Sequence, residues 1–207
     1  MPDQRIQFVK TGRACYISHL DLMRTFQRAF LRAGIHIRHT EGFNPHAYVS
    51  IPLPLSVGFS SQCEILEFGL PEGADMEAVP WRLTRVLPEG ITVTRCYDAE
   101  RPYKELCYVN YIITLEYDTG APGAENTIRA LLGRESLVVS KKSKKAKSGQ
   151  TQVDLIPLIQ RVDYEGRRDS IVLDTILRAQ NPGLNPALIV AAIREQCPEM
   201  APDYVSY

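Results

Sequence analysis

The sequence predicts an α+β fold in which two ferredoxin-like halves, each with the element order β-α-β-β-α-β, follow one another in tandem. Short stretches of alternating apolar and polar residues, typical of half-buried strands, are separated by segments with a helical apolar period. Turn residues mark most junctions between them. The same order recurs loosely in the second half of the 207-residue chain. We therefore predict an N-terminal domain at residues 1–100 and a C-terminal domain at residues 104–207.

The first half opens with an alternating strand at Gln4–Lys10. Ser18 is a typical helix N-cap with Asp21 three residues later, and Gly34 is a plausible helix stop. Prolines at positions 52 and 54 cannot donate to a sheet, so the segment around them is expected at an edge. The other elements predicted here are strands at Ile35–His39, Tyr48–Leu53, Gln62–Leu70 and Ile91–Tyr97, and a helix from Asp75 to about Leu87.

The second half repeats this order loosely. A lysine-rich loop is expected at residues 141–149, and Asn185-Pro186 is a typical start for the last helix. The elements predicted here are strands at Tyr108–Tyr117 and Leu137–Ser140, a helix at Ala124–Gly133, paired strands at Val153–Asp163 and Arg168–Ile176, a helix ending near Cys197, and a short strand near Tyr204.

Charge is distributed unevenly, although the formal net charge is zero. Seven Lys or Arg residues and three acids lie between Met1 and Ser60, whereas eight acids and three arginines lie between Glu64 and Glu100. Five lysines lie between Lys141 and Lys147. A locally positive surface on a neutral molecule is sufficient to attract phosphates, so the neutral balance does not exclude a nucleic-acid partner.

The five cysteines are scattered and show no C-x-x-C spacing, which is typical of reduced thiols in a cytoplasmic protein. The N-terminal residues have no apolar signal segment, and no stretch approaches the roughly 20 apolar residues that span a bilayer. We therefore predict a soluble cytoplasmic protein without membrane contact. We predict no cofactor and no metal, because the sequence has no phosphate-binding glycine loop and no paired histidine motif.

Two of the four histidines are candidates for acid-base chemistry. His46 follows an Asn-Pro turn in a predicted loop, where packing alone seldom requires an imidazole. His19 starts the first helix on the side of its apolar face, where a buried structural role is the alternative. His36 and His39 lie at odd spacing on one predicted strand and so on opposite faces.

Basic side chains form the second group of candidates. Arg24, Arg28 and Arg32 recur every four residues and share the polar face of the first helix. Each alone is best interpreted as a solvated residue, but together they could hold phosphates. The lysine loop suits an arm that contacts a phosphate backbone without reading sequence. The predicted nucleic-acid-binding residues are Lys10, Arg13, Arg24, Arg28, Arg32, Asn44, His46, Lys141, Lys142, Lys144, Lys145 and Lys147.

Four aromatic side chains lie near these basic residues, and they could stack on unpaired bases as in ferredoxin-like RNA-binding modules. The alternative is that most of them belong to the core. They are Tyr16, Phe43, Tyr48 and Phe59.

The stretches YISHLDLMRTFQRAFLRAG (residues 16–34) and EGFNPHAYVSIPLPLSVG (residues 41–58) resemble the radical-SAM-linked protein family of bacteria, and VDLIP at residues 153–157 also fits. Members of that family are of unassigned biochemical function. They occur fused to, or encoded beside, cobalamin-binding-type radical SAM proteins, often near genes for a ribonuclease and ribosomal proteins. Ala47-Tyr48 departs from the family pattern, where Pro-Lys is expected.

The chain lacks the C-x-x-x-C-x-x-C motif of a radical SAM catalyst, so the resemblance implies an accessory role beside such an enzyme. We predict an RNA-binding or substrate-presenting protein without catalysis of its own, with tRNA or rRNA as candidate substrates. One alternative is a metal-independent RNA-processing ribonuclease that uses His46 and His19, with Lys10 or Arg13 facing the phosphate. Another is a protein adaptor without RNA contact that docks through the proline-rich segment Ile51–Phe59.

Overall fold

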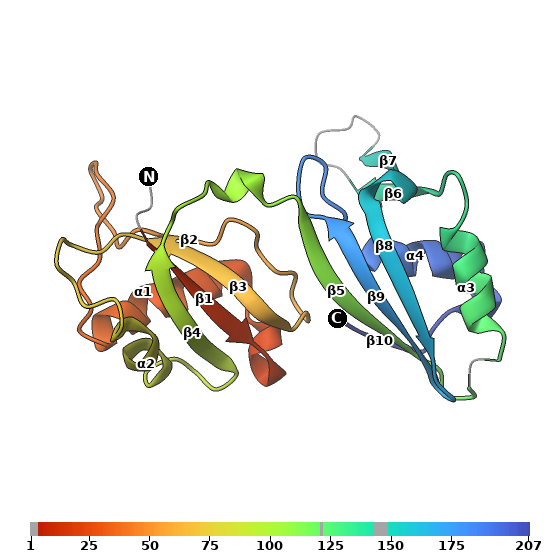
Figure 1. The fold of residues 1–207 in the computed structure, drawn as a ribbon, viewed down its shortest axis with the longest axis horizontal. Helices are drawn as coiled ribbons and strands as arrows, with labels where there is room; N and C mark the ends of the chain where they lie inside the picture. The colour runs from red at the N-terminus through yellow and green to blue at the C-terminus, as the bar shows by residue number, and fades with distance from the viewer. Residues whose placement is uncertain (1–3, 121, 143–148) are drawn as a thin grey trace. The chain divides into compact units, whose positions relative to one another are not determined.

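The computed structural model describes residues 4–120, 122–142 and 149–207, which form helices and antiparallel sheets of an α+β protein (Figure 1). The chain divides into two compact units, Met1–Tyr103 and Lys104–Tyr207. Each unit encloses a buried apolar cluster of its own. Every helix among the described residues is too short or too polar to traverse a bilayer.

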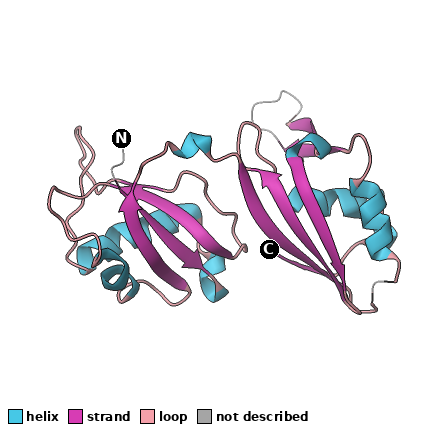
Figure 2. Cartoon of the chain, in the orientation of Figure 1, coloured by secondary structure: helices cyan, strands magenta, loops and turns pink. Residues whose placement is uncertain are grey.

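The first unit is built on a four-stranded sheet in the order β2-β3-β1-β4, with its helices on one face of the sheet (Figure 2). The central strand β1 pairs antiparallel with both β3 and β4. Along the chain the elements are β1 (Gln4–Lys10), the 3-10 helix η1 (Gly12–Tyr16), α1 (His19–Arg32), β2 (Val49–Ser50), β3 (Ser61–Phe68), α2 (Val79–Thr84) and β4 (Ile91–Asp98).

Aromatic contacts hold α1 on this sheet. Alternate residues of β1 face the helices, and both Ile6 and Phe8 are fully buried. The Phe8 ring meets Phe26 of α1 edge-on, with ring centroids 4.8 Å apart. One turn later Phe30 of α1 packs on Phe68 of β3, with centroids 4.9 Å apart. These contacts fix both the position of α1 and its rotation about its axis.

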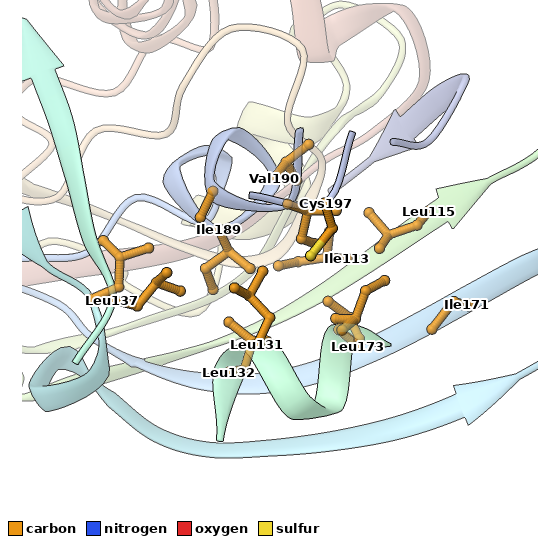
Figure 3. Packing of buried hydrophobic residues seen from close by; sticks show 14 of the residues in the cluster. Ile113, Leu115, Leu131, Leu132, Leu137, Ile171, Leu173, Ile189, Val190 and Cys197 are labelled. Carbon is orange, nitrogen blue, oxygen red and sulfur yellow. The ribbon is translucent and has the colours of Figure 1, made fainter. Parts of the chain in front are cut away.

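The second unit has the strand order β10-β5-β9-β8, with a separate β6-β7 sheet. Its core is aliphatic: Ile113 and Leu115 of β5 lie against Leu131 of α3 and Ile189 of α4 (Figure 3). After η2 (Tyr103–Glu105), the elements are β5 (Tyr108–Glu116), α3 (Ala124–Leu132), β6 (Val138–Lys142), β7 (Gln150–Asp154), η3 (Ile156–Leu158), β8 (Ile159–Gly166), β9 (Ser170–Arg178), α4 (Ala187–Gln196), η4 (Pro198–Met200) and β10 (Tyr204–Ser206).

Two strand predictions are wrong. The predicted strand Ile35–His39 is irregular backbone whose only bridge joins His39 to Ala47. The predicted strand Val153–Asp163 is two strands, because η3 interrupts it at Pro157. As a result β7 pairs with β6, and β8 pairs with β9.

A buried ion pair joins two neighbouring strands of the first sheet, on the face opposite to Ile6 and Phe8. Arg5 of β1 and Glu67 of β3 are register partners. Nε and Nη2 of Arg5 donate to Oε1 of Glu67 over 2.9 and 2.6 Å, and the two side chains are 9% and 5% exposed. Each charge depends on the other, because a buried charge that loses its partner is poorly solvated.

We predict that Arg5→Met lowers the free energy of unfolding of the first unit by about 3–5 kcal/mol, because Glu67 is left buried without a counter-charge. Arg5→Met/Glu67→Leu should recover most of that loss. Urea denaturation followed by fluorescence of the single tryptophan, Trp81 on α2, measures this unit. Arg24→Met breaks an exposed pair and serves as the control. A double variant as unstable as Arg5→Met would contradict the prediction.

Candidate nucleic-acid interface

Helix α1 begins at a side-chain cap, as its sequence predicts. The Ser18 hydroxyl accepts from the Asp21 backbone N–H at 3.2 Å and donates to the Asp21 carboxylate at 2.7 Å. Leu22 and Phe26 are buried against the sheet. Because α1 is held on this face, the positions opposite it point to solvent, and Arg24, Arg28 and Arg32 are all exposed.

The three arginines differ in the partners that their guanidinium groups already contact. Arg24 makes an exposed ion pair of 3.3 Å with Asp21. Hydrogen bonding from Ser18, and then from Arg24, lowers the pKa of Asp21, so this acid remains charged beside the row. Arg32 donates to the Val86 carbonyl, a neutral partner, at 2.8 Å. Exposed pairs of this kind are weak and screened, so the row remains available to an anion.

The second component of the interface is a short hairpin at residues 40–46, between α1 and β2 (Figure 1). The bridge between His39 and Ala47 closes its base. The Thr40 N–H donates to the His46 carbonyl at 2.8 Å, and the His46 N–H donates to the Thr40 hydroxyl at 3.2 Å. We call this segment the 40–46 hairpin. Its closure gives the tip a defined shape, although all residues from 41 to 46 are exposed.

The imidazole of His46 is held by the hairpin itself. Its Nδ1 lies 3.2 Å from the Asn44 carbonyl oxygen and 3.1 Å from the Thr40 hydroxyl oxygen. A carbonyl can only accept, so the contact with Asn44 is a hydrogen bond in the tautomer that carries its proton on Nδ1. In the neutral ring Nε2 is then a hydrogen-bond acceptor or base.

Helix α1 contacts the base of the hairpin. The Gln27 amide donates to the Ala47 carbonyl at 3.0 Å. Among the described residues, no hydrogen bond or ion pair joins His46 to Arg24, Arg28 or Arg32. The arginine row and the 40–46 hairpin are therefore linked through α1, by the hydrogen bond between Gln27 and Ala47.

The structure separates the four aromatic candidates. Phe59 is 6% exposed and belongs to the interior, and Tyr48 is half-buried. Tyr16 is 74% exposed on η1, and Phe43 is fully exposed at the tip of the 40–46 hairpin. Phe43 is thus the candidate that lies beside both His46 and Asn44.

Lys10 lies in the interior, not on the basic surface where we expected it. It continues the alternation of Ile6 and Phe8 and therefore faces the helices, with a side chain only 1% exposed. Its ammonium group donates to the Cys15 carbonyl at 3.1 Å. Burial lowers the pKa of Lys10, partly offset by Cys15 and Glu64. Arg13, by contrast, is exposed.

Glu64 lies close enough to Lys10 for their charges to interact, and His19 is a separate buried polar residue of this unit; sequence reasoning did not identify Glu64. Glu64 is half-buried on β3, where burial raises its pKa against the opposing effects of the Ser61 hydrogen bond and Lys10. His19 shares the face of α1 that carries Leu22, and its Nδ1 is buried without a hydrogen-bond partner among the described residues. For Lys10, the alternation of residues along β1 could have indicated from the sequence that its side chain faces the interior.

The two histidines proposed as an acid-base pair are not brought together. His19 opens α1, and the contact between α1 and the hairpin base lies eight residues later, at Gln27. Eight helical residues span about 12 Å. Among the described residues, no group of three His, Cys, Asp or Glu side chains is placed to hold a metal ion.

The predicted lysine arm lies only partly within the described residues. Lys141 and Lys142 lie on β6, which extends further than predicted. Lys144, Lys145 and Lys147 lie outside the described residues, so their part in the interface stays a prediction.

These features define the chain as an α+β protein of antiparallel sheets whose first unit presents an arginine-bearing helix face and an aromatic-tipped hairpin. Residues 4–186 match a family described as "Uncharacterized protein conserved in bacteria (DUF2344)", and the chain belongs to that family. The comparison with curated proteins found no match.

The half-buried Glu64 predicts a pH dependence. Because its pKa is raised in the folded state, the folded protein binds more protons than the unfolded chain above pH 4.5. The contribution of Glu64 to stability should therefore fall as the pH rises from about 4.5 towards neutrality. We expect Glu64→Gln to gain stability relative to wild type over this range, measured by urea denaturation at several pH values.

Glu72→Gln, which removes an exposed carboxylate in the same unit, is the matched control. A stability difference between wild type and Glu64→Gln that stays constant with pH would show that Glu64 is not held in the environment described here.

Proposed function

We propose that this protein is an accessory RNA-binding or substrate-presenting protein, without catalysis of its own, that works with a radical SAM RNA-modifying enzyme. The observation that carries the proposal is the pairing of the exposed arginine row with the 40–46 hairpin, both supported by α1. In this arrangement the arginines would hold phosphates, which position a nucleic acid, while the hairpin would meet the bases, which specify it.

We extend the proposal to the fold: each unit would be a ferredoxin-like domain. In the first unit the strand order β2-β3-β1-β4 accompanies the element order β-α-β-β-α-β, which supports this assignment. In the second unit β8-β9-β5-β10 gives the equivalent order once the β6-β7 sheet is treated as an insertion. The lysine-rich segment would then be an arm inserted into the second domain.

The partner in this proposal comes from the sequence resemblance in residues 16–34 and 41–58. A chain without a radical SAM cluster motif would bind the RNA or dock it, while the enzyme encoded nearby would perform the chemistry. We propose tRNA or rRNA as the shared substrate, in the cytoplasm.

We predict that the protein binds single-stranded or structured RNA with an affinity that falls steeply with salt. Arg24→Gln/Arg28→Gln/Arg32→Gln should weaken binding and reduce the slope of log K against log salt by about 2, since each phosphate contact contributes roughly 0.7. Fluorescence anisotropy of labelled cellular tRNA and rRNA fragments at several salt concentrations measures both quantities.

Arg161→Gln/Arg167→Gln/Arg168→Gln makes the same change in net charge on exposed residues of the second unit and is the control. Equal effects of the two triple variants would show that the arginine row acts only through the net charge of the protein. Absence of RNA binding by the wild-type protein would overturn the proposal.

A ribonuclease is the second candidate, favoured by the fixed ring of His46, which leaves Nε2 as a possible base. The separation of His19 from the hairpin base weighs against a two-histidine mechanism. If the protein is a ribonuclease, incubation with cellular RNA should give cleavage that His46→Ala reduces by at least tenfold. We expect intact RNA in both reactions, analysed by denaturing electrophoresis.

An adaptor without RNA contact is the third candidate. Ile51 and Phe59 are buried, so the proline-rich segment is anchored in the core at both ends. Val57 is 56% exposed, and the neighbouring Gly58 N–H donates to the Cys15 carbonyl, next to exposed Tyr16. Co-purification with the radical SAM enzyme in the absence of any RNA affinity would favour this reading.

A further inference from the structure

Phe43 is an exception among the phenylalanines of this chain. The sequence has six. Five of them are at most 6% exposed, whereas Phe43 has its entire ring in solvent. Placing a large apolar ring in water forgoes the stabilisation that burial would give it. Packing within the first unit therefore does not account for this side chain.

The 40–46 hairpin presents this ring on a closed support. The Thr40 N–H to His46 carbonyl bond and the His39–Ala47 bridge fix the two ends of the hairpin. Gly42 has a φ of +123°, a conformation that L side chains rarely adopt, and it turns the chain just before Phe43. A loop that is ordered before binding loses less conformational entropy when it engages a ligand.

The surroundings of the ring are polar. Asn44 is exposed and offers both an amide donor and an acceptor. His46 is exposed with its ring orientation set by Asn44 and Thr40. Glu41 adds a carboxylate, which accepts from amino groups and repels phosphate. Hydrogen-bonding side chains thus share the short hairpin with one exposed aromatic ring, a combination that suits a planar ligand with polar edges.

Resting on the proposed RNA-binding function, we infer that the 40–46 hairpin is a site for one unpaired nucleobase, with the Phe43 ring stacked on its face and Asn44 and His46 hydrogen-bonded to its edge. Single-stranded RNA is recognised through bases stacked on aromatic side chains and bonded at their edges. A protein partner is disfavoured, because the centre of a protein interface requires several apolar neighbours, and the hairpin offers one ring among polar groups.

The proposed site restricts which forms of RNA can bind. A base within a duplex is stacked on both sides and cannot reach Phe43, so the hairpin selects single strands, loops or bulges. The stacking contact is largely independent of salt, unlike the contacts of the arginine row. The two parts of the interface can therefore be separated experimentally.

The test uses the full-length chain carrying Trp81→Phe and Phe43→Trp, so that the only indole lies at the hairpin tip. Addition of a 12-nucleotide single-stranded RNA should quench its fluorescence, and an RNA duplex of the same sequence should not. A DNA strand of the same sequence separates recognition of the base from recognition of the ribose. Equal quenching by strand and duplex would overturn the inference.

Affinity provides the second measurement. Phe43→Leu, which keeps an apolar side chain but removes the ring, should weaken single-strand binding by about five- to a hundredfold at unchanged salt slope. Tyr204→Leu removes an exposed aromatic ring from the second unit and should leave binding unchanged. Thermal unfolding checks that both variants are folded.

The outcomes distinguish the two levels of the proposal. RNA binding that is intact in Phe43→Leu would overturn the base site and leave the RNA-binding function standing. No binding by the wild-type chain would overturn both. If Phe43→Leu no longer co-purified with the radical SAM enzyme but bound RNA with unchanged affinity, Phe43 would be assigned to a protein contact, and the base site would be overturned.

Discussion

The contact between Phe8 and Phe26 is the interaction on which the first unit depends. It joins the middle of the central strand to the middle of α1, with centroids 4.8 Å apart, and both rings are completely buried. Once this contact fixes the rotation of α1, residues on the opposite side of the helix have to face water. The arginines are exposed for that reason, and Gln27, on the flank, reaches the base of the 40–46 hairpin. Core packing thus sets the geometry of the surface.

The same sheet buries charge on both faces, by different means. Arg5 is matched by Glu67 at bonding distance, so each carries its counter-charge into the interior. Lys10 donates to a carbonyl, and its pKa is lowered by burial, while that of Glu64 is raised. The neutral form of the Lys10 amine is therefore more favourable in this interior position than it would be on the surface. His19 of α1 adds a further buried polar atom to this unit, since its Nδ1 has no hydrogen-bond partner among the described residues.

Sequence reasoning succeeded where local chemistry decides the outcome. Ser18 as N-cap, the exposed arginine row and the edge position of β2 follow from capping, helical period and proline chemistry, and the structure has all three. It failed where a distant segment decides. The Ile35–His39 segment alternates like a strand, but its Arg38 N–H bonds to Gly69, and no regular ladder forms along it.

Lys10 shows a different limit. The alternation that places Ile6 and Phe8 inside also places Lys10 inside, yet the charge of the residue outweighed the pattern in our prediction. A strand that ends under a 3-10 helix can bury a lysine because a carbonyl of that turn accepts a hydrogen bond from it. The sequence shows neither the turn's position over the strand nor that the Cys15 carbonyl, which also accepts from the Gly58 N–H, lies within reach of the lysine. Glu64 was missed for the same reason: it pairs in register with Phe8 and therefore shares the buried face of β3 with Leu66 and Phe68.

These placements change how RNA affinity would have to arise. The excess of basic residues between Met1 and Ser60 overstates the positive surface, because Lys10 is interior and Arg24 is beside Asp21. Phosphate contacts from the remaining arginines would give weak binding that physiological salt reduces further. A chain with zero net charge therefore needs contacts that salt does not screen if it is to hold RNA. Within the first unit, the exposed ring of Phe43 beside Asn44 and His46 is the described feature best suited to supply them, which makes base contacts rather than charge the expected source of selectivity.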